Sequence, residues 1–292
     1  MLWLIFLAAV GTSDAAASVP LTRSVSLAVY TKKLLPVEDL KAEEVLVSED
    51  GHPRKVLGVE TDHRPLDVAI VLDSGATVAA SYRSDLVPAV VEFWRALPPG
   101  TNVALWSTAP AKVVDFGGDL AAVETKLRMI AAAGGNYGFD SMIDACKELG
   151  TRRAARRAIV YVGSGSLQSS RSGTSALMQA IGAAHATPMV ALVLPSARGA
   201  FAGGPSGDAV QSWDVQGYFA EMSKAYHGSY VEALSTLAVA QWLRQFAADL
   251  NSQYRVRFES EAGPGGAVKV EVKRKDTKLR VGRTAEEILT VQ

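Results

Sequence analysis

Short apolar runs alternate with amphipathic stretches through the middle of the chain. Residues 66–72, 158–162 and 189–194 are almost wholly apolar, which predicts strands buried on both faces of a parallel sheet. Between these runs apolar residues recur at helical spacing, and strands that alternate with helices predict a doubly wound, mostly parallel α/β domain. The pattern predicts helices over 85–97, 119–133, 139–151, 175–186, 216–226 and 237–250, a strand pair at 102–107 and 112–116, and an edge strand at 230–233.

Both ends of the chain alternate between apolar and polar residues with a period of two. This pattern predicts antiparallel strands with one buried face and one wet face. The Asp50-Gly51 turn predicts a hairpin that pairs 44–48 with 55–60. Because two or three strands are marginally stable alone, we expect both ends to pack together into one small antiparallel β module. The strands are expected at 24–30, 44–48 and 55–60, and at 253–259, 267–273 and 278–281.

The first residues have the pattern of an export signal. Residues 2–10 are apolar and residues 15–17 are alanines that fit a cleavage site, so 1–17 is predicted to be a signal peptide and the protein to be secreted or periplasmic. No Lys or Arg precedes Arg23, so a retained hydrophobic anchor is the alternative. The mature parts are an N-terminal β segment at 18–64, an α/β domain at 65–252 and a C-terminal β segment at 253–292.

Composition excludes several classes of protein. The 292 residues are 48% hydrophobic and 21% charged, with a formal net charge of zero, so a large core is expected and general nucleic-acid binding is not. Cys146 is the single cysteine, which excludes an internal disulfide, and its apolar helical surroundings predict a buried thiol. The basic cluster at 152–157 is expected to be a solvated helix end.

Polar and glycine-rich segments follow the predicted central strands. They are Asp-Ser-Gly-Ala-Thr at 73–77, Gly-Gly-Asn-Tyr-Gly-Phe-Asp at 134–140 and Gly-Ser-Gly-Ser at 163–166. Open α/β sheets bind ligands at the carboxyl ends of their strands, so we expect these three segments to form the functional site.

With these segments the chain resembles a von Willebrand factor A domain, and most closely the acidobacterial von Willebrand factor A-related family of secreted bacterial proteins. In that fold a metal-ion-dependent adhesion site is built from Asp-x-Ser-x-Ser, a Thr and a second Asp. The first Asp matches Asp73, the two serines fall on Gly75 and Thr77, the Thr falls on Asn136 and the last Asp on Ser164.

The resemblance therefore implies a degenerate adhesion site. Magnesium prefers an octahedral shell of hard oxygens anchored by one or two carboxylates. Here Asp73 is the only carboxylate, with Thr77 as the remaining hydroxyl ligand, so we expect no cofactor, or weak Mg²⁺ binding only. The alternative is that Asp73 caps a helix or forms hydrogen bonds in its loop.

The resemblance also implies a non-catalytic function. We expect an exported, adhesion-type module that binds a protein or an extracellular ligand, makes no contact with nucleic acid, and touches a membrane only through its N-terminal segment. The glycine-rich loop at 198–213 is expected to contribute to partner contact. The candidate residues of the binding face are Ser74, Asn136, Tyr137, Ser164, Ser166 and Trp213; a one-residue gap in the motif would put Ser74 at its first Ser position.

Two alternatives to this function stay open. One is a serine hydrolase that uses Ser164 or Ser166, although the Gly-x-Ser-x-Gly elbow is absent there. The other is a structural subunit of an envelope assembly. Four histidines are present without metal-ligand spacing, at His52, His63, His185 and His227.

Overall fold

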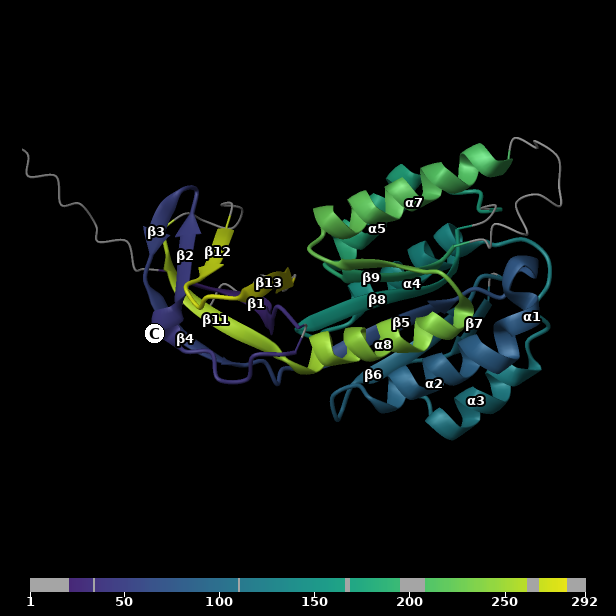
Figure 1. Ribbon diagram of the computed structural model, residues 1–292, viewed down its shortest axis with the longest axis horizontal. Helices are drawn as coiled ribbons and strands as arrows, with labels where there is room; N and C mark the ends of the chain where they lie inside the picture. Colours follow the sequence, from purple (N-terminus) through teal and green to yellow (C-terminus); the bar gives the residue numbers. More distant parts are fainter. Residues whose placement is uncertain are drawn as a thin grey trace, which may run out of the picture.

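The computed structural model describes residues 21–33, 35–109, 111–165, 169–194, 208–261 and 268–282, with only the backbone described at 208–214 and 279–282. In Figure 1 these residues form a layered α/β domain beside a smaller β module. None of the described helices is both long and apolar enough to cross a membrane.

A six-stranded sheet forms the centre of the α/β domain, in the order β10-β9-β8-β5-β6-β7. Its neighbours pair in parallel except β6 and β7, which are antiparallel. All seven residues of the central strand β5 are buried, as the apolar run predicts. The strands are β5 (Leu66–Leu72), β6 (Asn102–Ser107), β7 (Ala111–Val114), β8 (Arg156–Ser164), β9 (Thr187–Val193) and β10 (Ser229–Ala233).

Helices cover both faces of this sheet, each through its own apolar core (Figure 1). One layer consists of α2 (Val87–Arg95), α3 (Leu120–Met129) and α8 (Thr236–Asn251), and the other of α4 (Gly138–Thr151), α5 (Thr174–Ala184) and α7 (Asp208–Ala225). The short α1 (Ala79–Ser81) follows β5. This arrangement confirms the predicted doubly wound fold.

The β module combines strands from both ends of the chain in two sheets. Their orders are β13-β1-β11-β4 and β12-β2-β3, so each sheet contains strands from both terminal segments, as predicted. Alternate residues of β11 are buried and join the core between the sheets. The strands are β1 (Leu21–Thr31), β2 (Val45–Glu49), β3 (His52–Arg54), β4 (Val56–Thr61), β11 (Gln253–Ser260), β12 (Val268–Val272) and β13 (Thr277–Gly282).

Three local predictions about strand and helix boundaries are wrong. Strand β2 pairs with the short β3 rather than with 55–60, because β4 crosses to the other sheet and pairs with β11. Helix α3 ends at Met129, before residue 133. Helix α7 begins at Asp208, so the end of the expected 198–213 loop is helical; residues 198–207 lie outside the described residues.

The predicted solvated helix end at 152–157 is also wrong. Arg156 is 4% exposed, and its guanidinium donates to the carbonyl oxygens of Asp62 and Leu250. Arg152 forms an ion pair with the buried Asp67, and Arg157 donates to the carbonyl oxygen of Ala184 over 3.0 Å. These arginines satisfy backbone acceptors and a buried carboxylate at the amino-end edge of the sheet.

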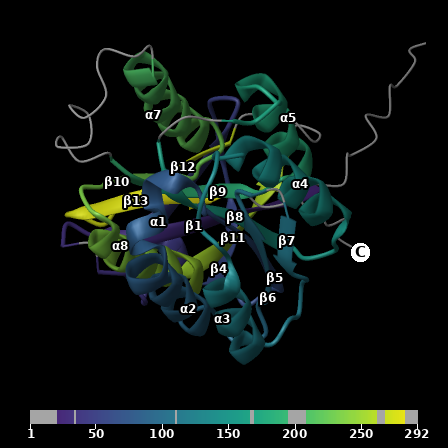
Figure 2. The same cartoon turned by 90° about the vertical axis from the view of Figure 1, so that its right-hand side faces the viewer.

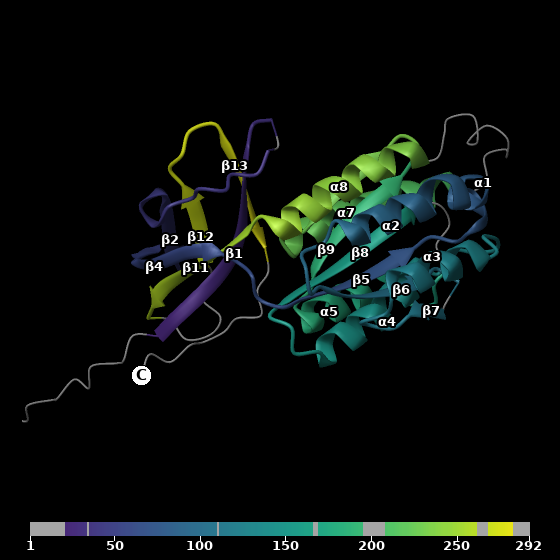
Figure 3. The ribbon, with the colours of Figure 1, turned by 90° about the horizontal axis from the view of Figure 1, so that it is seen from below.

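Strand β1, predicted to be half-buried, is buried along both faces. One face joins the apolar core of the module. On the other face the Tyr30 hydroxyl donates to Asp249 at the end of α8, and the Ser26 hydroxyl donates to Asp62 over 2.9 Å. Helix α8 leads directly into β11 at this junction (Figure 3). Two polar side chains on this face of β1 therefore bond to α8 and to the linker that leads into β5.

Candidate functional site

The three polar segments meet at the carboxyl ends of β5 and β8, the edge of the sheet that faces the viewer in Figure 2. Asp73 continues the pairing of these strands, because its N–H donates to the carbonyl oxygen of Val162 over 2.8 Å. Gly163 makes this close approach possible: a Cβ there would lie 2.3 Å from the Cβ of Asp73. Because glycine has no side chain, the Asp73 carboxylate can lie against Gly163 and accept from the Ser164 N–H that follows it.

The Asp73 carboxylate accepts five hydrogen bonds and is fully buried. Its Oδ1 accepts from the Gly75 N–H (2.7 Å) and the Thr108 hydroxyl (3.2 Å). Its Oδ2 accepts from the Asn136 amide (3.0 Å), and from the Ser164 N–H (2.8 Å) and hydroxyl (2.7 Å). An ionised carboxylate has about four lone-pair positions, so protein donors use its whole accepting capacity.

Asn136 connects this carboxylate to the helix that follows. Its Oδ1 accepts from the Gly138 N–H at the start of α4 over 2.8 Å, which leaves its Nδ2 to donate to Asp73 and to the Tyr161 hydroxyl (2.9 Å). Tyr161 in turn donates to the Ser164 carbonyl oxygen (3.2 Å). The amide oxygen is therefore engaged by the first N–H of α4, and the amide nitrogen is turned to Asp73.

The other predicted site residues lie around this network. Ser74 is buried, and its hydroxyl accepts from the Ala109 N–H over 3.3 Å. Thr77 is exposed, in the 3-10 turn Ala76–Val78. Tyr137 is half-buried, and its N–H donates to the Thr108 carbonyl oxygen over 3.0 Å. Trp213 lies in α7, where only the backbone is described, and Ser166 lies outside the described residues.

Sequence reasoning missed Thr108 and Tyr161. Thr108 follows β6 directly, at the same edge of the sheet as Asp73. A polar residue just after the strand that neighbours β5 is a sequence feature that could have predicted its place in the site. Tyr161 lies within an apolar strand, where the sequence pattern predicts that a tyrosine packs in the hydrophobic core. Its ring does stack on Phe219, with 5.0 Å between centroids, and only the fold shows that its hydroxyl reaches Asn136.

Tyr82 contributes a further buried hydroxyl in the π-helical turn Tyr82–Leu86 that precedes α2. The side chain is fully buried, and its hydroxyl has no hydrogen-bond partner among the described residues. Burial raises its pKa, and the Asp73 carboxylate raises it further, although Arg83 opposes this. Tyr82 therefore stays neutral and adds no second negative charge beside Asp73.

This donor set does not fit a divalent cation. Magnesium needs oxygen lone pairs directed at it, whereas the groups around Asp73 direct N–H and O–H hydrogens towards the carboxylate. The described residues also contain no group of three or more His, Cys, Asp and Glu side chains that could hold a metal. Metal binding would require most of this network to break.

Ser164 is poorly placed for nucleophilic chemistry. A serine nucleophile needs an adjacent general base and access to substrate, but Ser164 is 2% exposed and its hydroxyl already donates to Asp73. Each of the four histidines lies in the β module, at the junction, or at the amino ends of the parallel strands: they are His52, His63, His185 and His227. None of them is near the carboxyl ends of β5 and β8.

Comparisons with known proteins identify the fold. No family model matches the sequence, and the search of curated proteins found no match. Among solved structures, a von Willebrand factor type A protein from Catenulispora acidiphila superposes with a TM-score of 0.50 and 11% identity, over 93% of this chain and 75% of that one.

Two further structures score lower. Proximal thread matrix protein 1 from the mussel byssus gives a TM-score of 0.49 at 9% identity, over 74% of this chain and 50% of that one. The von Willebrand factor domain of a type V pili tip protein from Porphyromonas gingivalis gives 0.48 at 12% identity, over 66% and 96%. At 11% identity the superposition on the Catenulispora acidiphila protein carries the fold and no activity. On the strength of the sheet order, the helix layers and the first superposition, the chain has the von Willebrand factor A fold.

Proposed function

We propose that the chain is an exported binding module of the acidobacterial von Willebrand factor A-related type, and that it holds a protein partner at the carboxyl-end face of its six-stranded sheet without a metal ion. The observation that carries this proposal is where its exposed apolar side chains lie. Among the described residues the three most exposed large hydrophobic side chains are Met129 (77%), Leu234 (83%) and Leu237 (74%).

All three belong to this one face. Leu234 follows the carboxyl end of β10, and Leu237 lies in the first turn of α8. Met129 ends α3, just before the loop whose Gly134 carbonyl oxygen accepts from Ala76 over 3.0 Å. Exposed apolar residues scattered singly are ordinary on protein surfaces, but here the three most exposed ones share one face, which supports a partner surface there.

The hydrogen-bonded state of Asp73 supports the metal-free part of the proposal. In the intact adhesion site of the family that the sequence resembles, the partner's carboxylate completes the coordination of the bound metal. Here protein donors compensate the Asp73 charge from within, which supports a degenerate site that works without a metal. Contact with the partner then depends on apolar area and on hydroxyl groups such as that of the exposed Thr77.

The test is partner capture with a photo-crosslinker at Thr77, using the full chain in the cell envelope of its own organism. The variant Leu234→Glu/Leu237→Glu replaces the apolar contacts, and Leu46→Glu/Leu57→Glu is the matched control, because these leucines are exposed on the β module. We expect the first variant to lose the crosslinked partner and the control to keep it. Capture should be the same in EDTA and in Mg²⁺.

Two outcomes would overturn the proposal. Capture that EDTA abolishes would show that a metal is required, and capture that survives Leu234→Glu/Leu237→Glu would place the interface elsewhere. Labelling of Ser164 or Ser166 by a serine-reactive phosphonate would favour the hydrolase alternative instead.

A further inference from the structure

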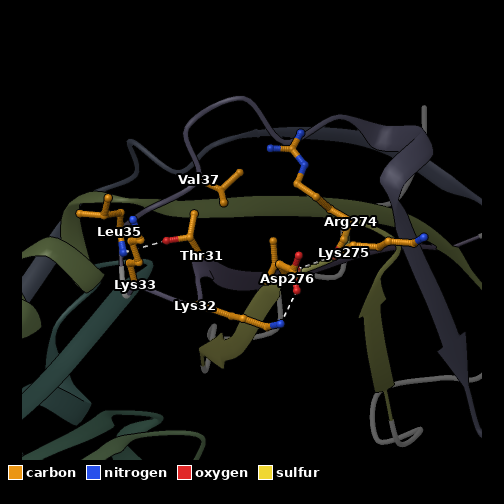
Figure 4. Close-up of a pocket in the computed structure, with 9 residues that line it drawn as sticks. Thr31, Lys32, Lys33, Leu35, Val37, Arg274, Lys275 and Asp276 are labelled. Atoms are coloured by element: carbon orange, nitrogen blue, oxygen red, sulfur yellow. Dashed lines mark hydrogen bonds and ion pairs between the residues drawn. The ribbon is translucent and has the colours of Figure 1, made fainter.

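A basic hollow of about 450 Å³ lies on the β module, away from the carboxyl-end face. Two turns form it: the one that ends β1 and the one between β12 and β13. Figure 4 shows Lys33 and Leu35 on one side of the hollow and Lys275 on the other, with Lys32 reaching Asp276 between them.

The two turns concentrate positive charge in a chain whose net charge is zero. Three exposed lysines, Lys32, Lys33 and Lys275, line the hollow together with one exposed aspartate, Asp276. Lys32 pairs with Asp276, but these side chains are 71% and 72% exposed, so water screens the pair and it is readily exchanged. In the described part of the chain Lys33 and Lys275 have no ion pair.

Arg274 fixes the shape of the hollow rather than offering a free charge. Its guanidinium forms ion pairs with Glu44 (2.7 Å) and Asp39 (2.6 Å), and this fork geometry orients the arginine rigidly. The Lys32 N–H donates to the Asp276 carbonyl oxygen over 3.0 Å, which ties the two turns together. The hollow is therefore largely preformed, and a ligand need not order it.

The floor of the hollow is aliphatic. Val37 is buried, and Leu35, which is 60% exposed, presents one large apolar side chain beside Lys33 (Figure 4). A bilayer-binding surface generally presents several insertable apolar or aromatic side chains, and single-stranded nucleic acid is held by aromatic stacking, which the residues lining this hollow lack. A concave, basic and aliphatic surface instead matches a chain with alternating acidic and aliphatic side chains.

We propose that this hollow binds an acidic, extended segment of a partner protein. Lys33 and Lys275 contact its carboxylates, and Leu35 and Val37 contact an aliphatic side chain between them. Because the hollow belongs to the β module, this interaction is separate from the one proposed at the carboxyl-end face.

The test uses the full chain and a fluorescent peptide of alternating Glu and Leu, with fluorescence anisotropy as the readout. The variant Lys33→Glu/Lys275→Glu reverses both free charges. Its matched control is Lys147→Glu/Lys224→Glu, which makes the same charge change on exposed positions of α4 and α7. We expect the hollow variant to bind at least about tenfold more weakly, in line with the loss of two charge-assisted contacts, and the control to match the unmodified chain.

Affinity should also fall as salt is raised and vanish for a peptide with Gln in place of Glu. Equal loss in both variants would attribute binding to net charge, and an unaffected hollow variant would exclude the hollow; either result overturns the proposal. So would lysine-dependent cosedimentation with phosphatidylserine vesicles in the absence of peptide binding, which would make the partner a membrane.

Discussion

At the scale of single residues, Asp73 determines the character of the site. A buried carboxylate is tolerated only when its charge is compensated, and here five protein donors do this. Gly75 contributes an N–H instead of a serine hydroxyl, and Ser164 contributes both an N–H and an O–H where the adhesion motif has a carboxylate. At three positions of that motif, Gly75, Asn136 and Ser164, the residue present therefore donates a hydrogen bond to Asp73.

Replacing Asp73 by Asn should destabilise the fold. The amide is similar in size but turns an N–H₂ group towards donors that need an acceptor, so we expect a loss of about 2–4 kcal/mol, measured by urea denaturation. Asp144→Asn, at a side chain that is 60% exposed, is the control and should change stability by less than about 0.5 kcal/mol. Equal stability of the two variants would mean that the network contributes nothing.

Restoring the motif should create a metal site. The variant Gly75→Ser/Asn136→Thr/Ser164→Asp replaces donors by oxygen ligands and places a second carboxylate beside Asp73, and these like charges destabilise the metal-free form. We expect Mg²⁺ to stabilise this variant by about 2.7 kcal/mol at about 100 times Kd and to leave the unmodified chain unchanged, measured by thermal denaturation and calorimetry.

The control for this experiment is Gly75→Ser/Asn136→Thr/Ser164→Asn, which lacks the second carboxylate. Stabilisation of the control by Mg²⁺ would show that Asp73 alone anchors a metal, and stabilisation of the unmodified chain would contradict the hydrogen-bonded description of the site.

At the scale of elements, the site depends on how closely β5 and β8 approach at their carboxyl ends. The two strands pair in register up to Leu72 and Val162, and the next residue of each, Asp73 and Gly163, would collide if Gly163 carried a side chain. Glycine at this point is required by packing and not by backbone conformation, since Gly163 is not among the residues with positive φ.

Gly163→Ala should therefore push the two strand ends apart. Its Cβ would lie 2.3 Å from the Asp73 Cβ, and overpacking of this kind typically costs about 1–3 kcal/mol. Gly217→Ala is the matched control, because nothing lies within 4 Å of its Cβ; in helix α7 that change should stabilise by about 0.5–1 kcal/mol. Opposite signs in denaturant unfolding are expected, and a neutral or stabilising Gly163→Ala would contradict the close approach.

At the scale of the whole molecule, a polar junction joins the α/β domain to the β module. Tyr30 and Ser26 of β1 bond to Asp249 and Asp62, and Arg156 bonds to carbonyl oxygens of the linker and of α8. Asp62 also pairs with Arg64 over 2.7 Å. Because these groups are buried and paired, the two parts should be stable together rather than as independent units.

Stability should fall in acid through Asp62. Burial raises the pKa of this carboxyl, but the hydrogen bond and charge of Arg64, with Arg156 and Ser26, outweigh burial and hold the pKa below its ordinary 3.8. A lowered folded pKa stabilises the protein above the unfolded value, and this contribution is lost as pH falls through the folded value. The stability difference between the unmodified chain and Asp62→Asn should thus shrink below about pH 4.

Urea denaturation across this range measures that difference. Asp144→Asn is again the control, and its curve should run parallel to that of the unmodified chain. A constant difference for Asp62→Asn at every pH would contradict the role of the ionised carboxylate.

The sequence alone determined the class of fold and most of its elements. Buried strands such as 66–72 and 158–162 must be continuous apolar runs, and amphipathic helices must show a 3.6-residue period, so local pattern is sufficient for them. The terminal strands were also predicted to join, because neither set can bury its apolar face alone. The sequence also predicted that Asp73, Asn136 and Ser164 lie close together, because the carboxyl ends of parallel strands share one edge of the sheet.

Only the tertiary structure decided what these groups do. Whether Asn136 turns its oxygen or its nitrogen to Asp73 depends on the Gly138 N–H, and the burial of Arg156 depends on carbonyl oxygens far along the chain. The crossing of β4 to another sheet is set by its pairing with β11, which no turn residue encodes. Sequence patterns report which face of an element is apolar, whereas the partner of a polar group is set by long-range packing, and so only the fold shows that protein donors surround Asp73.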